Sequence, residues 1–165
     1  MNDEAASLIS RLGLAPLPEE GGFFATTWRG APRGPDGRAC GSSILFLITP
    51  GDFSALHRLR TDEIWHYHAG DPAELVRLDP ATGALEVAVL GPDVAGDHVP
   101  QSVARAGVWQ GCRIQPSAAS RGWTLFGCTL APAWDPEEFE LGDRDALAAA
   151  FPGHRAWVGA LTRLP

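Results

Sequence analysis

Residues 57–70 read HRLRTDEIWHYHAG and place three of the chain's five histidines within one short stretch. Short runs of strand-forming residues lie at both of its ends. Side chains on a strand alternate between its two faces, so His57 and Leu59 share one face, as do His66 and His68. The stretch therefore predicts two strands that carry polar groups, and raises the question of which groups share a site.

The same strand signal recurs along most of the chain, and the runs are separated by turn signals such as Asp79-Pro80-Ala81-Thr82-Gly83. A further strand around Phe23 precedes a flexible Gly/Pro-rich loop over residues 30–37. About eight to ten strands in this order predict an all-β antiparallel sandwich or barrel. The predicted strand runs are 43–49, 55–59, 64–69, 73–78, 85–90, 101–104, 111–114 and 123–130.

Two segments predict short helices at the ends of the chain. Residues 3–12 place apolar side chains at helical spacing, and Gly13 ends the pattern. Near the C-terminus, Asp143 caps an Ala-rich helix that Pro152 terminates. We expect this helical tail to pack against the outside of the sandwich.

Length and composition favour a single cytoplasmic domain with a small-molecule ligand. The 165 residues suit one domain over residues 1–165. The net charge of −7 disfavours binding to nucleic acid or an anionic membrane. Three distant cysteines argue against a disulfide framework and a thiolate zinc site, and the N-terminus shows no secretion signal.

Two spacings resemble the cupin motifs. Gly51-x5-His57-x-Leu59-x3-Glu63-x6-Gly70 is similar to the first motif, in which a second histidine normally stands at the position of Leu59. Residues 105–110, RAGVWQ, resemble the second motif, with Gln110 in place of its histidine. Beyond these motifs, nearly the whole chain resembles the DUF985 or "cupin 5" family, through the strings PEEGGFFATTWR, LHRLRTDEIWHYHAGDP, VLGPDVAGDHVPQSV and GCTLAPAWDPEEFELGDRDAL.

The resemblance implies a double-stranded β-helix, the cupin jelly roll, with short N-terminal and C-terminal helices, and a homodimer. One departure concerns residues 18–22, which read PEEGG where the family usually has His-Pro-Glu-Gly-Gly. Pro18 stands at the position of that histidine, so this chain lacks the histidine and any role that the family assigns to it.

If the resemblance holds, Glu63 begins its strand pointing into the barrel. Alternation then sends Trp65 and Tyr67 inward, and His66 and His68 outward. A structural or interface role is favoured for these two histidines over a metal or catalytic pair. His57, Glu63 and Gln110 would form a polar cluster inside an aromatic barrel. The alternative is that these three groups only satisfy one another's hydrogen bonds.

The chemistry of this cluster favours proton transfer over metal binding. A buried His57 near Glu63 makes an acid/base pair in which the carboxylate raises the histidine pKa. Leu59 supplies no metal ligand and Gln110 only a neutral amide oxygen, so no metal is favoured. If a divalent transition metal does bind, its ligands would be His57, Glu63 and Gln110.

Other side chains are candidates for contacts with a ligand. Aromatic rings offer flat surfaces on which a sugar, a nucleobase or an aromatic acid could stack, although barrel core is the commoner fate of such rings. Polar groups on nearby strands could orient hydroxyls of the ligand. The aromatic candidates are Trp65, Tyr67, Trp109 and Trp28, and the polar ones are Gln101, Ser43 and Thr27.

Three functions stay open at this point. The first is a metal-independent isomerase, epimerase or lyase that moves a proton on a small polar, carbohydrate-like metabolite, with His57 and Glu63 as acid and base. The second is a cupin that binds a metabolite without turning it over. The third is a metal-dependent oxygenase or decarboxylase.

Overall fold

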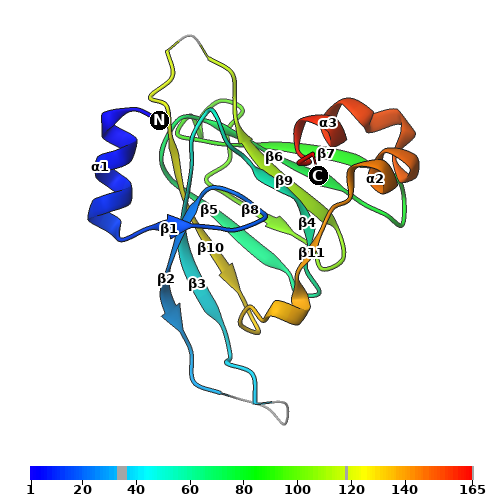
Figure 1. Ribbon diagram of the computed structural model, residues 1–165, viewed down its shortest axis with the longest axis horizontal. Coiled ribbons are helices and arrows are strands. Elements are labelled where there is room, and N and C mark those ends of the chain that lie inside the picture. Colours follow the sequence, from blue (N-terminus) through cyan, green and yellow to red (C-terminus); the bar gives the residue numbers. More distant parts are fainter. Residues whose placement is uncertain (33–36, 118, 165) are drawn as a thin grey trace.

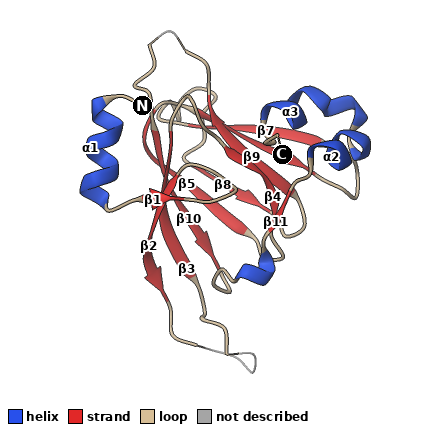
Figure 2. Cartoon of the chain, in the orientation of Figure 1, coloured by secondary structure: helices blue, strands red, loops and turns tan. Residues whose placement is uncertain are grey.

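The structure is a computed structural model that describes residues 1–32, 37–117 and 119–164. Part of the loop expected over residues 30–37 therefore lies outside the described residues. The all-β prediction with short terminal helices is confirmed (Figure 2). The strands are β1 (Ala15–Pro16), β2 (Phe23–Arg29), β3 (Ser42–Ile48), β4 (Ser54–Arg58), β5 (Glu63–Gly70), β6 (Ala73–Leu78), β7 (Leu85–Leu90), β8 (Gln101–Ala104), β9 (Trp109–Ile114), β10 (Thr124–Leu130) and β11 (Glu140–Leu141).

The strands form two antiparallel sheets. One has the order β1-β2-β3-β10-β5-β8, and the other has the order β11-β4-β9-β6-β7. The two halves of the opening stretch thus belong to different sheets, because β4 lies in the second and β5 in the first. Apolar side chains from the facing sides of both sheets, such as Phe46 and Leu75, pack into one central core.

The helices cover the outer sides of the sheets (Figure 1). Helix α1 (Asp3–Leu12) begins after Asn2, whose side chain accepts a hydrogen bond from the backbone N–H of Ala5. The helix packs near Leu47 of the first sheet and near Trp123, which directly precedes β10. At the other end of the chain, apolar residues of the helical tail pack on the second sheet, as expected from the sequence. This tail consists of the 3-10 helix η1 (Pro136–Glu138), α2 (Arg144–Ala150), the 3-10 helix η2 (Pro152–His154) and α3 (Arg155–Ala160). None of the helices in the described part of the chain has the length and hydropathy needed to cross a membrane.

The space between the sheets differs from one end to the other. At one end, Phe126 packs edge-to-face or stacked with Phe46 and Trp65, whose rings form the border with the other end, and the ring centroids lie 5.4 to 6.4 Å apart. At the other end, the facing strands separate around a cavity that contains charged side chains. This open end holds the candidate site.

Candidate functional site

The cavity has a volume of about 540 Å³, which is in the usual range for a small-molecule site. Its walls are mostly apolar. Two carboxylates lie beside His57, and other polar side chains, such as Arg29 and Ser42, line the cavity near Trp134. The lining residues are Leu17, Pro18, Glu19, Glu20, Phe24, Thr26, Arg29, Ser42, Ile44, Phe46, His57, Leu59, Glu63, Trp65, Cys128, Leu130, Trp134, Pro136 and Phe139.

His57 is held rigidly on β4 at the inner end of the cavity, with only 2% of its surface exposed. Its Nδ1 lies 2.8 Å from the carbonyl oxygen of Ala55, and because a carbonyl only accepts, Nδ1 carries the proton and donates. The Phe139 ring stacks on the imidazole at a centroid distance of 5.4 Å. These contacts fix the ring so that its Nε2 faces Glu63.

Two carboxylates flank the imidazole. Oε1 of Glu20 lies 3.9 Å from Nδ1 of His57, and Oε2 of Glu63 lies 3.9 Å from Nε2. Burial by itself lowers the pKa of His57, but the charges of Glu20 and Glu63 outweigh that effect and raise it to about 9. His57 is therefore an imidazolium at neutral pH. Burial raises the pKa of Glu20 above its ordinary value, which the positive charge of His57 partly offsets.

Gln110 links Glu63 to the aromatic wall. Its side-chain N–H donates to Oε2 of Glu63 at 2.7 Å, and its oxygen accepts from the indole N–H of Trp65 at 2.8 Å. An indole N–H can only donate, so the amide oxygen of Gln110 must face Trp65 and its NH₂ group must face Glu63. The register supports this arrangement, since Gln110 on β9 pairs directly with His57 on β4.

This orientation bears on metal binding. A cation between His57 and Glu63 would meet the NH₂ group of Gln110, which is not a metal ligand, and the side chain of Leu59. In the described residues there is no group of three or more His, Cys, Asp or Glu side chains that could hold a metal ion. The donors present thus do not fit a transition-metal site of the kind that cupin motifs suggest.

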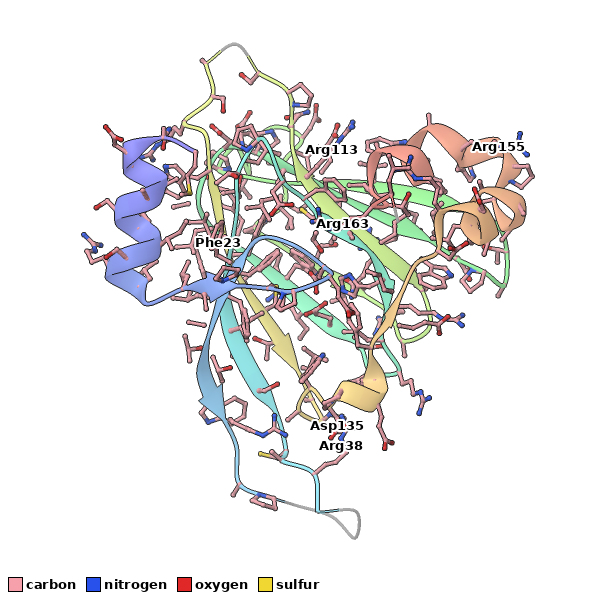
Figure 3. The ribbon with its side chains drawn as sticks, in the orientation of Figure 1. Phe23, Arg38, Arg113, Asp135, Arg155 and Arg163 are labelled. Carbon is pink, nitrogen blue, oxygen red and sulfur yellow. The ribbon has the colours of Figure 1, made fainter. Side chains whose placement is uncertain are left out.

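The loop between β1 and β2 carries Glu20 and is held by Arg163, near the C-terminus (Figure 3). The Arg163 guanidinium donates to the carbonyl oxygens of Glu19 and Glu20 at 2.9 Å and to Oδ1 of Asp52 at 2.7 Å. Gly21 has φ 101°, and a side chain there would collide with this guanidinium. Glycine at this position therefore lets the clamp close over the loop that positions Glu20.

The mouth of the cavity lies under the segment that contains η1. Trp134 of this segment is tied to the first sheet at one side of the opening, because its backbone N–H donates to Ser42 on β3 and its carbonyl oxygen accepts from Arg29 on β2. Arg38 pairs with the buried Glu138 at 2.7 Å, and Figure 3 shows Arg38 beside η1. These contacts hold the segment across the opening.

Of the residues singled out in the sequence, the structure brings His57, Glu63, Trp65 and Gln110 together at the inner end of the cavity. Tyr67 also points inward, but it lies farther along β5 in the packed core, where its hydroxyl donates to the carbonyl oxygen of Gly70. It does not line the cavity.

Trp109 lies on the opposite face of β9 from Gln110. It packs under the C-terminal helices with Leu147 and Val158, and the Arg58 guanidinium covers its ring at 4.7 Å. Neighbouring residues of a strand point to opposite faces, so Trp109 cannot share the interior with Gln110. Trp109 therefore does not line the cavity, contrary to the expectation that it contacts the same ligand as Gln110.

Four further candidates lie on the outer face of the first sheet, away from the cavity. Alternation sets this placement for Gln101 and Ser43, whereas Thr27 stands at a register shift between β2 and β3. Gln101 hydrogen-bonds to Nδ1 of His66 at 2.9 Å, and Thr27 donates to the carbonyl oxygen of Ser43. Trp28 is 49% exposed and covers Gly41.

Sequence reasoning missed Glu20 and Phe139 as parts of the site. A signal for Glu20 exists in the sequence, because an acidic pair stands directly before Gly21-Gly22, where it departs from the family pattern. Phe139 gave no signal of its own, since it lies in the tail beyond the last long strand.

With this geometry in hand, comparison with known proteins identifies the family. The family described as Cupin superfamily (DUF985), Cupin_5, matches residues 6–142. The chain belongs to this family. The predicted resemblance to the DUF985 cupins is therefore confirmed, and with it the jelly-roll fold.

Two solved structures match nearly the whole chain. A protein of Shewanella oneidensis is 33% identical, with a TM-score of 0.89 over 100% of this chain and 99% of its own. A hypothetical protein from Leishmania major is 28% identical, with a TM-score of 0.87 over 97% of this chain and 99% of its own.

A more distant match shows only the shared fold of this DUF985 cupin. Oxalate decarboxylase from Bacillus subtilis is 13% identical, with a TM-score of 0.56 over 90% of this chain and 37% of its own. No protein with a curated description matches the chain.

Proposed function

We propose that this DUF985 cupin is a metal-independent isomerase, epimerase or lyase that moves a proton on a small metabolite with a polar end. The observation that carries the proposal is the placement of His57 between Glu20 and Glu63 at the inner end of a cavity of ligand size. An imidazolium beside carboxylates provides a proton donor and a proton acceptor within reach of one bound molecule.

Each group has a distinct part in this reaction. Glu63, held by Gln110, accepts a proton from the substrate. His57 gives its Nε2 proton to the substrate atom that becomes electron-rich, and Nδ1 stays bonded to Ala55 so that the ring does not rotate. Proton return to His57 from Glu63 completes an isomerisation, and loss of a leaving group in place of reprotonation gives a lyase.

The proposal uses no metal, because the amide orientation of Gln110 and the apolar Leu59 deprive a cation of ligands. The same argument weighs against the oxygenase and decarboxylase hypothesis. Small-molecule binding without turnover is the second candidate. It is favoured by the mutual hydrogen bonds of the cluster, in which Gln110 engages both Glu63 and Trp65.

Deuterium exchange tests the proposal even though the substrate is unidentified. Purified protein is incubated in D₂O with a pool of metabolites, and mass spectrometry detects deuterium at carbon-bound positions. We expect incorporation into at least one compound. Glu63→Gln and His57→Gln should each slow it by about 100-fold or more, which is usual for a lost general acid or base.

Trp109→Phe is the matched control, because this side chain lies outside the cavity and the variant should exchange at the wild-type rate. Unchanged exchange in both site variants would reject the roles of His57 and Glu63. A compound that stabilises the protein but shows no exchange and no product would favour binding without turnover. The homodimer and the cytoplasmic location remain predictions from the sequence.

A further inference from the structure

The cavity has an apolar body and a polar inner end. Aromatic rings and aliphatic side chains form most of its lining, including Phe24, Ile44, Trp65 and Leu130. A ligand that fills it must therefore bury a largely apolar body, because polar groups along these walls would lose their hydrogen bonds to water without replacement.

The inner end offers unused hydrogen-bond acceptors. Oε2 of Glu63 accepts from Gln110, and Oε1 of Glu20 accepts from the hydroxyl of Ser54 at 2.7 Å. Across residues 1–32, 37–117 and 119–164, no hydrogen bond engages the second oxygen of either carboxylate. Neither oxygen is among the fully buried, unpaired polar atoms of the described residues, so each keeps access to the cavity that Glu20 and Glu63 line and can accept a hydrogen bond from the ligand's head.

Charge at the inner end disfavours an anion. Two carboxylates face one imidazolium there, and the whole chain carries a net charge of −7. Arg29 is the only arginine among the described lining residues, and it is an exposed side chain whose guanidinium donates to the carbonyl oxygen of Trp134. A carboxylate or phosphate head would therefore meet like charge in a poorly hydrated site.

We infer that the cavity selects a small molecule with an apolar, preferably aromatic body and a head that is cationic or neutral and donates hydrogen bonds, such as an amine or an alcohol. Carboxylates and phosphates are rejected. The aromatic walls suit an ammonium head as well, since rings of Trp and Phe attract cations. This inference rests on the proposed function in taking the cavity as the ligand site, but it requires no turnover.

A matched series of probes tests it. 2-Phenylethylamine, 2-phenylethanol and phenylacetate share a ring and differ in the charge of the head. Isothermal titration calorimetry at neutral pH should show that the amine and the alcohol bind at least about tenfold more tightly than phenylacetate, a difference that one or two charged hydrogen bonds produce. In the Glu20→Gln/Glu63→Gln double variant, the difference in affinity between phenylacetate and the other two probes should shrink to about threefold or less. Trp109→Phe should leave it unchanged.

Phenylacetate that binds as tightly as the other two, or more tightly, would overturn the inference. Failure of all three probes to bind would overturn it as well, because the cavity would then not accept an aromatic body. If the double variant does not fold, the affinities of the three probes for the wild-type protein are sufficient to decide the test. None of these outcomes depends on proton transfer. The calorimetry can therefore support the ligand class even if the deuterium experiment fails, and the deuterium experiment can succeed even if the calorimetry fails.

Discussion

The two ends of the barrel interior are built from the same strands but serve different purposes. On β10, Phe126 belongs to the packed end and Leu130 lines the cavity. On β5, Tyr67 lies in the packed core and Glu63 at the cavity. The packed end removes apolar surface from water, which stabilises the fold. The open end buries charged groups, which costs free energy of desolvation unless they are paired.

This comparison explains why the charged groups of the open end lie next to groups of opposite charge. His57 is only 2% exposed, so its positive charge needs a carboxylate beside it, which Glu63 supplies. Glu20 joins them from a loop. Substitutions at the packed end should therefore lower the free energy of unfolding. At the open end, the free energy of unfolding should also depend on pH and on a bound ligand.

The largest effect is expected from truncating a leucine at the packed end. Leu75→Ala removes a fully buried side chain and leaves a void among close-packed neighbours, which should lower the free energy of unfolding by about 3–5 kcal/mol. Leu59→Ala is the matched change at the open end and should cost only about 1–2 kcal/mol, because it enlarges a space that already exists. Urea denaturation of both variants measures the difference. Equal losses would mean that the cavity end is as tightly packed as the core.

The next effect concerns pH at the open end. The pKa of His57 is raised from 6.5 in the unfolded chain to about 9 in the folded protein. A raised pKa stabilises the fold fully below pH 6.5, and this contribution disappears as the pH rises through 9. The loss is on the order of 3 kcal/mol. Denaturation curves between about pH 6 and about pH 10 should show the decline.

His57→Gln is the control for that titration, because glutamine can still donate to the carbonyl of Ala55 but carries no titratable proton. Its stability should be almost independent of pH over the same window. A wild-type protein whose stability stays flat from pH 6.5 to 9 would contradict the coupling of His57 to the two carboxylates.

The fold and half of the site could be predicted from the sequence because both depend on local rules. Alternation placed Glu63 and Trp65 inside and His66 outside, and the structure agrees. The same rule, applied to β9, would have separated Trp109 from Gln110, since adjacent residues of a strand cannot share a face. Trp109 is wrongly expected at the ligand because the similarity to the second cupin motif does not say which of its residues face the barrel interior.

The rest of the site could not be predicted because it comes from segments that tertiary contacts position. Glu20 reaches the cavity because Arg163, 143 residues away in the chain, binds its carbonyl oxygen. Phe139 reaches His57 because the tail crosses the barrel mouth and pairs β11 with β4. No periodicity or spacing encodes such long-range contacts.

The smallest effect, and the sharpest test of how the open end is assembled, is expected from Arg163→Ala. The substitution frees the loop that carries Glu20 and removes a positive charge that lowers the pKa of Glu20. Both changes weaken one of the two carboxylates that raise the pKa of His57, so that pKa should fall below its wild-type value of about 9, while Glu63 still holds it above 6.5. Arg163 is partly exposed, so the loss of stability should be only about 1 kcal/mol.

Nuclear magnetic resonance titration of the His57 ring measures this pKa directly. Arg155→Ala is the matched control, because Arg155 lies on α3 and makes one long hydrogen bond, 3.4 Å, to the carbonyl oxygen of Ala148 (Figure 3). It should leave the titration of His57 unchanged. A His57 pKa that stays at its wild-type value in Arg163→Ala would mean that the loop holds Glu20 without the clamp. In that case the backbone turn at Gly21-Gly22 and the hydrogen bond from Ser54 would suffice to place the second carboxylate.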